Sequence, residues 1–293
     1  LMTDISIVCE IDPSARISPN VVLGDHCVIG PNVTIGPSTV VGKNVTITGH
    51  TSIGSGNVIG DGCVFGVHPQ DLKYAGSPTL LIIGHHNRFG ENVSAHIGTE
   101  FGGYLTRIGD YNVFGDYSHI AHDCYVDDHT TIHARAMLAG HIHICNGVVL
   151  REDSGVHHFV TIGRYAMIGA RTPVRRDVPP YTHFCGDRGI ETPAVRGVHA
   201  EGIAAAGIGA REQKELRRAL ADLFDDESAL QTKIEQLVNL GVEGEVEHLC
   251  QFCQNSLQGV FGRYRERYRG QLAPEAEQYL TPEQLAEARR ALP

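Results

Sequence analysis

Residues 108–144 read IGDYNVFGDYSHIAHDCYVDDHTTIHARAMLAGHIHI, and an apolar residue stands at every sixth position of this stretch. These positions are Ile108, Phe114, Ile120, Val126, Ile132, Leu138 and Ile144. A helix would repeat near every 3.6 residues and a two-faced strand every second residue, so a period of six predicts short strands joined by regular corners. Such a repeat indicates a solenoid, in which each coil buries its apolar side chains against the next coil.

The same pattern extends in both directions from this stretch. It runs from Ile17 to Phe65, returns from Ile83 to Ala95, and continues after Ile144 as far as Ile168. Three hexapeptides make one triangular coil, in which the apolar residue points inward and the small residue after it permits a tight corner. The sequence therefore predicts a mainly β fold, a parallel β-helix of stacked coils. The period alone does not decide its handedness.

Two segments interrupt the pattern, and the C-terminal third of the chain lacks it. Residues 66–82 and 96–107 are expected to loop outward from the ladder. The prolines in Asp177-Val178-Pro179-Pro180 have no amide hydrogen, which predicts that the solenoid ends near them. Beyond this point the apolar spacing is helical. We expect a hexapeptide domain at 1–190 and an α-helical domain at 191–293, with three or four helices capping the coil end.

Local motifs in the helical part favour structure over chemistry. Thr281-Pro282-Glu283-Gln284 combines an N-cap, a first-turn proline and a capping-box glutamine, so it predicts the start of the last short helix. Cys250 and Cys253 stand three residues apart in a helical pattern, with no second pair at zinc-like spacing. Helix packing is the better interpretation of this pair.

Composition narrows the class of protein. The chain has 293 residues, eight cysteines and a formal net charge of −10. This charge disfavours nucleic acid as a partner. No apolar run is long enough to span a bilayer and no signal peptide is visible, so we expect a cytoplasmic protein with no transmembrane segment and no disulfides.

A ridge of histidines follows from the stacking of the coils. Because three hexapeptides complete one coil, Ile120, Leu138 and Val156 should lie above one another. Their neighbours are His119, His122, Gly140, His141, His157 and His158. Such a ridge is consistent with a metal site, a general-base site or a solvated polar face, and spacing alone leaves these open.

Four segments carry a resemblance to a known family. They are Gln70-Asp71-Leu72-Lys73-Tyr74-Ala75-Gly76, His119-Ile120-Ala121-His122-Asp123-Cys124, Leu138-Ala139-Gly140-His141 and Asp177-Val178-Pro179-Pro180-Tyr181. Together they resemble the UDP-N-acetylglucosamine O-acyltransferases that begin lipid A synthesis, and the similarity runs to about residue 203. The resemblance implies a left-handed β-helix and a homotrimer with sites shared between subunits. It also implies transfer of a fatty, 3-hydroxylated acyl group from acyl carrier protein to the sugar 3-hydroxyl. The carrier thioester is then a substrate, and no cofactor or metal is expected.

Roles for individual residues follow from this resemblance. It implies that His122 is the general base, which suits a neutral imidazole near neutral pH. The Gly140 N–H would donate to the oxyanion, and glycine would let the acyl chain approach closely. Asp123 is a weak candidate for the partner that orients His122, because adjacent residues of a strand point apart. The implied substrate contacts are Gln70, Asp71, Lys73, His96, His119, His141, His157, His158, His199 and Glu201.

The donor side has its own candidates. Ala170 aligns with the position that limits acyl length in the family, and its small size predicts a chain of about 12 carbons or slightly more, since each buried methylene contributes about 0.8 kcal/mol. A cluster of arginines is expected to receive the acidic carrier protein. It consists of Arg164, Arg171, Arg175 and Arg176.

The chain also departs from the family pattern. Ala204-Ala205-Ala206 replaces paired arginines, and Ile97 replaces an arginine after His96. His199 and His158 stand where the family has asparagine and glutamine, which changes the available donors and acceptors. Alternatives are a different nucleotide sugar, acetyl-CoA as donor, the later N-acylation step, a metalloenzyme like γ-type carbonic anhydrase, or a nucleotide-sugar binding protein without turnover.

Overall fold

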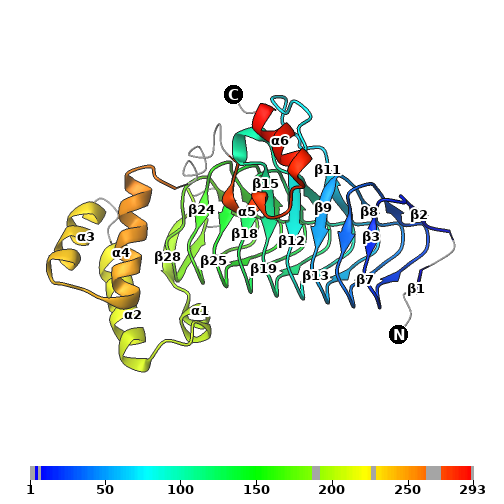
Figure 1. Cartoon of the computed structure of the whole chain (residues 1–293). Helices are drawn as coiled ribbons and strands as arrows, with labels where there is room; N and C mark the ends of the chain where they lie inside the picture. Colours follow the sequence, from blue (N-terminus) through cyan, green and yellow to red (C-terminus); the bar gives the residue numbers. More distant parts are fainter. Residues whose placement is uncertain (1–3, 6–7, 187–191, 226–228, 262–271, 292–293) are drawn as a thin grey trace.

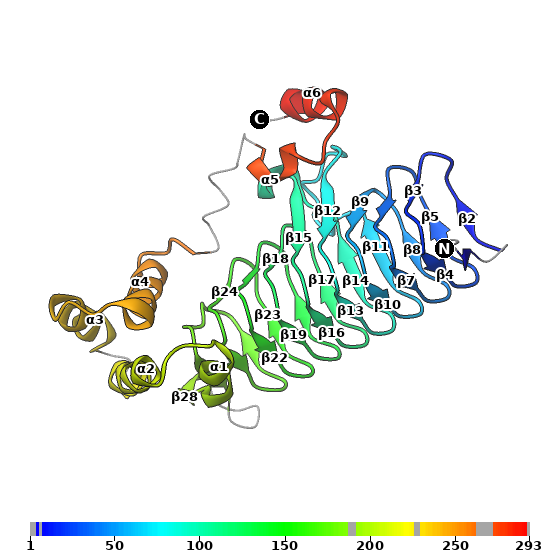
Figure 2. The ribbon, with the colours of Figure 1, turned by 60° about the horizontal axis from the view of Figure 1, so that its bottom comes forward.

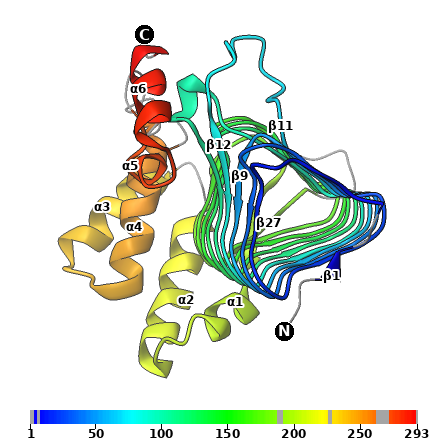
Figure 3. The same ribbon diagram turned by 45° about the vertical axis from the view of Figure 1, so that its right-hand side comes forward.

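The computed structural model describes residues 4–5, 8–186, 192–225, 229–261 and 272–291. Its main body is a triangular prism of stacked coils, with helices at one end and along one side (Figures 1 and 3). The prism is a left-handed parallel β-helix, so the predicted mainly β solenoid with C-terminal helices is confirmed. No helix in the described ranges is long and apolar enough to cross a bilayer.

Three sheets form the sides of the prism, and successive strands pass from one sheet to the next. Sheet A contains β1 (Asp4–Ile5), β4 (Val22–Leu23), β7 (Val40–Val41), β10 (Val58–Ile59), β13 (Arg88–Phe89), β16 (Val113–Phe114), β19 (Thr131–Ile132), β22 (Val149–Leu150), β25 (Met167–Ile168), β27 (Thr182–Cys185) and β28 (Ala194–Val198). Sheet B contains β2 (Glu10–Ile11), β5 (Val28–Ile29), β8 (Thr46–Ile47), β11 (Val64–Val67), β14 (Ser94–His96), β17 (His119–Ile120), β20 (Met137–Leu138), β23 (Gly155–Val156) and β26 (Pro173–Val174). Sheet C contains β3 (Arg16–Ile17), β6 (Thr34–Ile35), β9 (His50–Ile53), β12 (Leu80–Ile83), β15 (Leu105–Ile108), β18 (Tyr125–Val126), β21 (His143–Ile144) and β24 (Thr161–Ile162).

The predicted stacking is confirmed by the strand register. Ile120 lies opposite Leu138, and Leu138 lies opposite Val156, all in parallel pairing. These side chains are buried in one continuous apolar core that runs along the prism. The period of six therefore reports the core directly, because each hexapeptide contributes one inward side chain to each coil.

The corners differ in detail from the expectation. The left-handed backbone conformation falls three residues after the inward side chain, at Asp123 (φ 59°), His141 (φ 62°) and Phe159 (φ 63°) along one edge. The small residue directly after the inward position is needed for a different reason. A Cβ on Gly24 would lie 2.6 Å from the carbonyl oxygen of Gly42, so glycine lets neighbouring coils stack closely rather than turn the corner.

The interruptions are shorter than predicted, because strands occupy their ends. β11 continues to Val67 and β12 begins at Leu80, so the first outward segment is 68–79 rather than 66–82. It projects from one edge of the prism (Figure 3). The second segment is 97–104 rather than 96–107, and it contains the 3₁₀ turn η1 (Glu100–Gly102). We call these segments the first loop and the second loop.

The predicted end of the solenoid near Pro179-Pro180 is wrong by one strand. These prolines lie in a corner, where no ladder hydrogen bond is lost, and β27 then pairs in parallel with β25. β28 adds an antiparallel strand to β27. The expected domain boundary at residue 190 lies outside the described residues.

Helices occupy two separate places. α1 (Ala200–Ala205), α2 (Ala210–Phe224), α3 (Leu230–Asn239) and α4 (Gly244–Leu257) lie at the coil end, as expected (Figure 1). Cys250 and Cys253 are buried there among apolar side chains. However, α5 (Pro274–Glu277) and α6 (Pro282–Ala291) do not cap the coil end, because they pack on sheet C (Figure 2). The predicted start of α6 is confirmed by reciprocal bonds between Thr281 and Gln284.

Candidate active site

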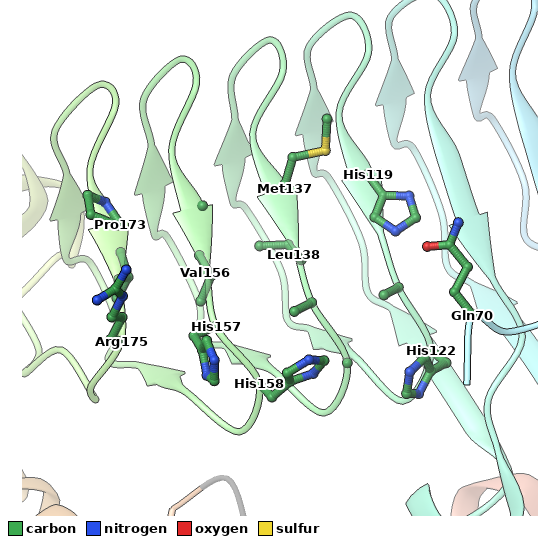
Figure 4. A pocket seen from close by; sticks show the side chains of 15 residues that line it. Gln70, His119, His122, Met137, Leu138, Val156, His157, His158, Pro173 and Arg175 are labelled. Carbon is green, nitrogen blue, oxygen red and sulfur yellow. The ribbon is translucent and has the colours of Figure 1, made fainter. Parts of the chain in front are cut away.

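A groove of about 420 Å³ runs along sheet B, across β17, β20, β23 and β26 (Figure 4). It brings together several of the predicted site residues, which come from different coils and from the first loop. These are Gln70, His119, His122, Gly140, His157, His158 and Arg175. The groove floor between them is largely apolar, with Leu138 and Val156 among its lining side chains. This combination of an apolar trough and imidazoles suits a fatty chain with a reactive end.

His122 lines this groove and is paired with Asp123. Its Nδ1 is 2.7 Å from Oδ2 of Asp123, and both side chains are buried. An ionised carboxylate only accepts, so Nδ1–H donates and Nε2 keeps a free lone pair. The expectation that Asp123 is a weak partner is wrong. Asp123 is in the left-handed corner conformation rather than in a strand, so its side chain turns to the same side as that of His122.

The second loop holds Asp123 in this position. The N–H and the Oγ1–H of Thr99 donate to its two carboxylate oxygens, each at 2.7 Å, and the Asp123 N–H donates to Oγ1 of Thr106 at 2.8 Å. Burial acts to raise the pKa of Asp123, but the hydrogen bond from His122 and the charge of His141 outweigh it, so the pKa lies below its ordinary value. Asp123 is therefore a carboxylate near neutral pH.

Asp123→Asn is expected to destabilise the fold by about 1–3 kcal/mol at neutral pH, because an amide cannot accept all these bonds. A lowered native pKa gives stability that is present above the ordinary pKa of about 3.9 and is lost as pH falls through the native pKa. The difference between wild type and variant should thus persist down to about pH 4 and shrink only in stronger acid. Urea unfolding at neutral pH and at about pH 3 checks this, and a difference that grows in acid would contradict it.

Gly140 lies against the imidazole of His122. A Cβ on Gly140 would stand 2.5 Å from Cε1 and 2.7 Å from Nε2 of His122. Any larger residue at position 140 would therefore clash with the His122 ring. This is a second reason for glycine here, beside the close approach of an acyl chain that the resemblance implies. Among the described residues, the Gly140 N–H has no hydrogen-bond acceptor, which leaves a backbone donor beside the base.

His141 and Asp71 lie beside His122. The ring of His141 meets that of His122 edge to face at 5.2 Å and stacks on Phe159 at 4.7 Å. Three atoms that could ligate a metal, one each from Asp71, His122 and His141, lie within 4.8 Å of one another. The first loop thus brings Asp71 to the histidine pair. Such a set of atoms could also ligate a metal ion.

Two further histidines border the base. Nδ1 of His96 donates to the carbonyl of His68 at 2.7 Å, and Nδ1 of His119 is 2.8 Å from Oγ of Ser94. Burial, helped by the charge of His122, lowers the pKa of His96. Burial, followed by the charges of His96 and His122, lowers the pKa of His119 to about 4. His119 is therefore neutral near neutral pH, and it offers hydrogen bonds without adding a cation.

The other predicted residues lie elsewhere. Lys73 is exposed on the first loop, where its N–H donates to Asp71. His199 is bonded to the carbonyl of Tyr165, and Glu201 is on α1, so both lie by the edge between sheets C and A. The His122 site is at the edge between sheets B and C. One subunit alone does not bring these two sets together.

The four arginines predicted to receive the carrier protein lie in different surroundings. Arg164 donates to Glu245 of α4 and lies over the ring of Tyr181, so it ties the helices to the coil rather than facing a partner. Arg171 is exposed at the corner between sheets A and B, next to the exposed Ala170. Arg175 lines the groove, and Arg176 donates to the carbonyl of Pro193.

Thr99 and Thr106 are site residues that the sequence pattern does not predict. They lie in and directly after an interruption of the repeat, where no periodicity says which way a side chain points. Thr99 bonds the buried carboxylate of Asp123 and Thr106 accepts from its backbone N–H, and these contacts become visible only once the second loop is folded.

Both the repeats and the helices of this chain match known protein families. Residues 5–37 match a family described as bacterial transferase hexapeptide (six repeats), and residues 177–261 match the second domain of UDP N-acetylglucosamine O-acyltransferase. The likeness to this family therefore extends beyond residue 203, where the sequence analysis ended it.

Similar proteins were found among both characterised sequences and solved structures. The acyl-[acyl-carrier-protein]–UDP-N-acetylglucosamine O-acyltransferase of Nautilia profundicola is 35% identical over 204 residues, which cover 70% of this chain and 77% of that protein. The structure of LpxA from Acinetobacter baumannii is 35% identical with a TM-score of 0.79, covering 87% of this chain and 96% of that one. UDP-N-acetylglucosamine O-acyltransferase from Moraxella catarrhalis is 34% identical with a TM-score of 0.78, covering 86% and 97% respectively.

Proposed function

This chain belongs to the family of UDP-N-acetylglucosamine O-acyltransferases, and on that premise we propose that it moves an acyl group from acyl carrier protein to a hydroxyl of UDP-N-acetylglucosamine. The observation that carries the proposal is the His122–Asp123 pair, which opens onto a largely apolar groove beside the Gly140 N–H. The 3-hydroxyl as acceptor and a place at the start of lipid A synthesis are what the family resemblance implies.

The reaction needs only the groups present at this site. Nε2 of His122 takes the proton of the sugar hydroxyl while its oxygen attacks the thioester carbon. The resulting oxyanion accepts from the Gly140 N–H, and Asp123 stabilises the imidazolium that forms. The C–S bond then breaks, and the proton on His122 passes to the departing thiolate of the carrier. No covalent enzyme intermediate and no cofactor is required.

Substrate contacts are proposed for the polar residues around the base. Asp71 and His141 lie beside His122, where they can bond sugar hydroxyls. Gln70 and Lys73 are on the same first loop, and the Lys73 ammonium suits a phosphate. His96 and His119 border the base from the other side, and His157 and His158 lie further along the groove toward the thioester and acyl chain.

A homotrimer is proposed from the division of the site. His199 and Glu201 are expected to contact the nucleotide, yet they lie at a different edge of the prism from His122. A second copy of the chain, placed with that edge against sheet B, would complete the site. Ala204-Ala205-Ala206 supplies no charge there, so the nucleotide would be held more by neutral donors than by arginines.

The acyl carrier protein, which carries the acyl group, is proposed to approach from the coil end. Arg175 lines the groove and Arg171 and Arg176 are exposed nearby, which suits an acidic carrier protein. Ala170 lies at the neighbouring corner, and an acyl chain of about 12 carbons or slightly more remains the expectation.

Reversing two of these charges tests the docking surface. Arg175→Glu combined with Arg176→Glu is expected to raise KM for the acyl carrier protein about tenfold or more, because each exposed ion pair contributes up to about 1 kcal/mol and like charges repel. Steady-state kinetics with the carrier protein varied checks this. Arg218→Glu, an exposed position on α2, is the matched control. An unchanged KM in the double variant would remove the docking proposal.

A purified assay with several UDP-sugars and acyl carrier proteins of different chain length tests the function itself. We expect UDP-N-acetylglucosamine to be acylated and medium-length donors to be preferred over acetyl. The Asp71–His122–His141 set favours one second candidate, a metal-dependent hydration like that of γ-type carbonic anhydrase. A stoichiometric ion in the purified protein together with no acyl transfer would favour that candidate.

A further inference from the structure

The terminal arm, residues 272–291, lies against sheet C at the level of the two loops rather than at the coil end (Figures 2 and 3). Its apolar side chains pack on a strip of the solenoid. The joined residues are Leu80, Ile82, Tyr104, Leu105 and Tyr125 of the solenoid, and Leu272, Ala273, Ala276, Leu280 and Ala288 of the arm. The arm therefore covers apolar surface beside the site.

Two hydrogen bonds tether the arm to one turn. The N–H of Ala273, just before α5, donates to the carbonyl of Gly103 at 3.2 Å. The hydroxyl of Tyr104 donates to the carbonyl of Ala288 in α6, also at 3.2 Å, and Tyr104 is fully buried. Both ends of the arm thus hold consecutive residues at the end of the second loop.

The second loop contacts two parts of the active site, the Asp123 carboxylate and the first loop. Thr99 holds the Asp123 carboxylate with its N–H and its hydroxyl. The next residue, Glu100, is 4% exposed, and its Oε1 accepts from the N–H groups of Ala75 and Ser77 at 3.2 and 3.1 Å. Ala75 and Ser77 belong to the first loop, which carries Asp71 and Lys73.

Burial of the Glu100 carboxylate is unfavourable for folding. Its Oε2 has no hydrogen-bond partner among the described residues, although the atom is shielded from solvent. A buried carboxylate oxygen without a partner costs stability, so the contacts of Oε1 call for a role beyond folding. Those contacts fix where the first loop returns to the prism.

From these contacts we propose that the terminal arm and Glu100 form a positioning element for the active site. The arm fixes the second loop, Glu100 then holds the first loop and its Asp71, and Thr99 holds Asp123 and, through it, His122. Glu100 does not touch the substrate and acts through Asp71. The proposal rests on the proposed function only in treating Asp71 as a substrate contact.

Amide hydrogen exchange tests whether the terminal arm holds the two loops in place, and it does not require turnover. Ala288→Arg places a large cation where Ala288 is fully buried, whereas Ala286→Arg on the exposed face of α6 is the matched control. Full-length Ala288→Arg should exchange amides in residues 68–79 about tenfold faster or more than the control. Leu280→Ala, which removes only packing of the arm on sheet C, should give a smaller change of the same sign and serves if Ala288→Arg does not fold. Faster exchange confined to the arm would overturn the proposal.

Kinetics of two Glu100 variants test the positioning role. Glu100→Ala should raise KM for UDP-N-acetylglucosamine about 10–100-fold, because Asp71 is displaced, while the pH dependence of kcat keeps its shape. Glu100→Gln should restore KM, since its carbonyl oxygen accepts the same two N–H bonds. An unchanged KM in the alanine variant, or no rescue by glutamine, would overturn the role. If wild type transfers no acyl group, the proposed function fails and the exchange experiment still decides on the arm.

Discussion

His122→Ala is expected to lower kcat by about 10²–10⁴-fold, the usual contribution of a positioned general base. The loss should fall on kcat more than on KM, because the sugar retains Asp71 and His141 as contacts. Initial rates with saturating donor and varied nucleotide sugar measure both constants.

Controls for this variant must separate chemistry from folding. His26→Ala removes an exposed histidine at the edge between sheets A and B, near the N-terminal end of the prism, and it should leave kcat unchanged. The thermal unfolding midpoint of His122→Ala should stay within a few degrees of wild type. Full activity in a well-folded His122→Ala protein would remove this residue from the mechanism.

Gly140→Ala is expected to lower kcat by about 10²-fold although it adds a single methyl group, because small misplacements of a catalytic group are costly. The new Cβ would stand 2.5 Å from Cε1 of His122, so the imidazole must move away from its place beside Asp123. The backbone donor is also displaced with it. Steady-state kcat measured beside thermal unfolding distinguishes this from loss of the fold.

The chain offers a matched control for this change. Gly155 lines the same groove, and a Cβ there would meet nothing within 4 Å. Gly155→Ala should therefore retain kcat close to wild type. Equal losses in both alanine variants would indicate general crowding of the groove, and they would argue against a specific contact between residue 140 and the base.

The sequence predicts the parts of this molecule that repeat. The inward column from Ile108 to Ile168 follows from apolar spacing alone, and so does the stacking of Ile120, Leu138 and Val156 beneath the histidine ridge. Each coil repeats the same local geometry, so a pattern in one hexapeptide holds in the next. The roles of His122 and Gly140 needed the family resemblance in addition.

The parts that depend on single corners or distant contacts were not predictable in this way. The repeat pattern predicts a strand residue at Asp123, whereas its left-handed backbone turns the side chain toward His122. The bond from Tyr104 to Ala288 joins residues 184 positions apart, and helical spacing does not say which surface α6 covers. The ion pair of Arg164 with Glu245 likewise removes one arginine from the expected docking cluster.

A crystal structure of the protein bound to UDP-N-acetylglucosamine tests the assignment of the site most directly, through the distance from Nε2 of His122 to the nearest sugar hydroxyl oxygen. We predict that the 3-hydroxyl lies within about 2.6–3.2 Å of Nε2, with the nucleotide crossing to His199 of a second copy. A sugar bound in the groove with all hydroxyls beyond the reach of His122, or bound away from sheet B, would contradict the account.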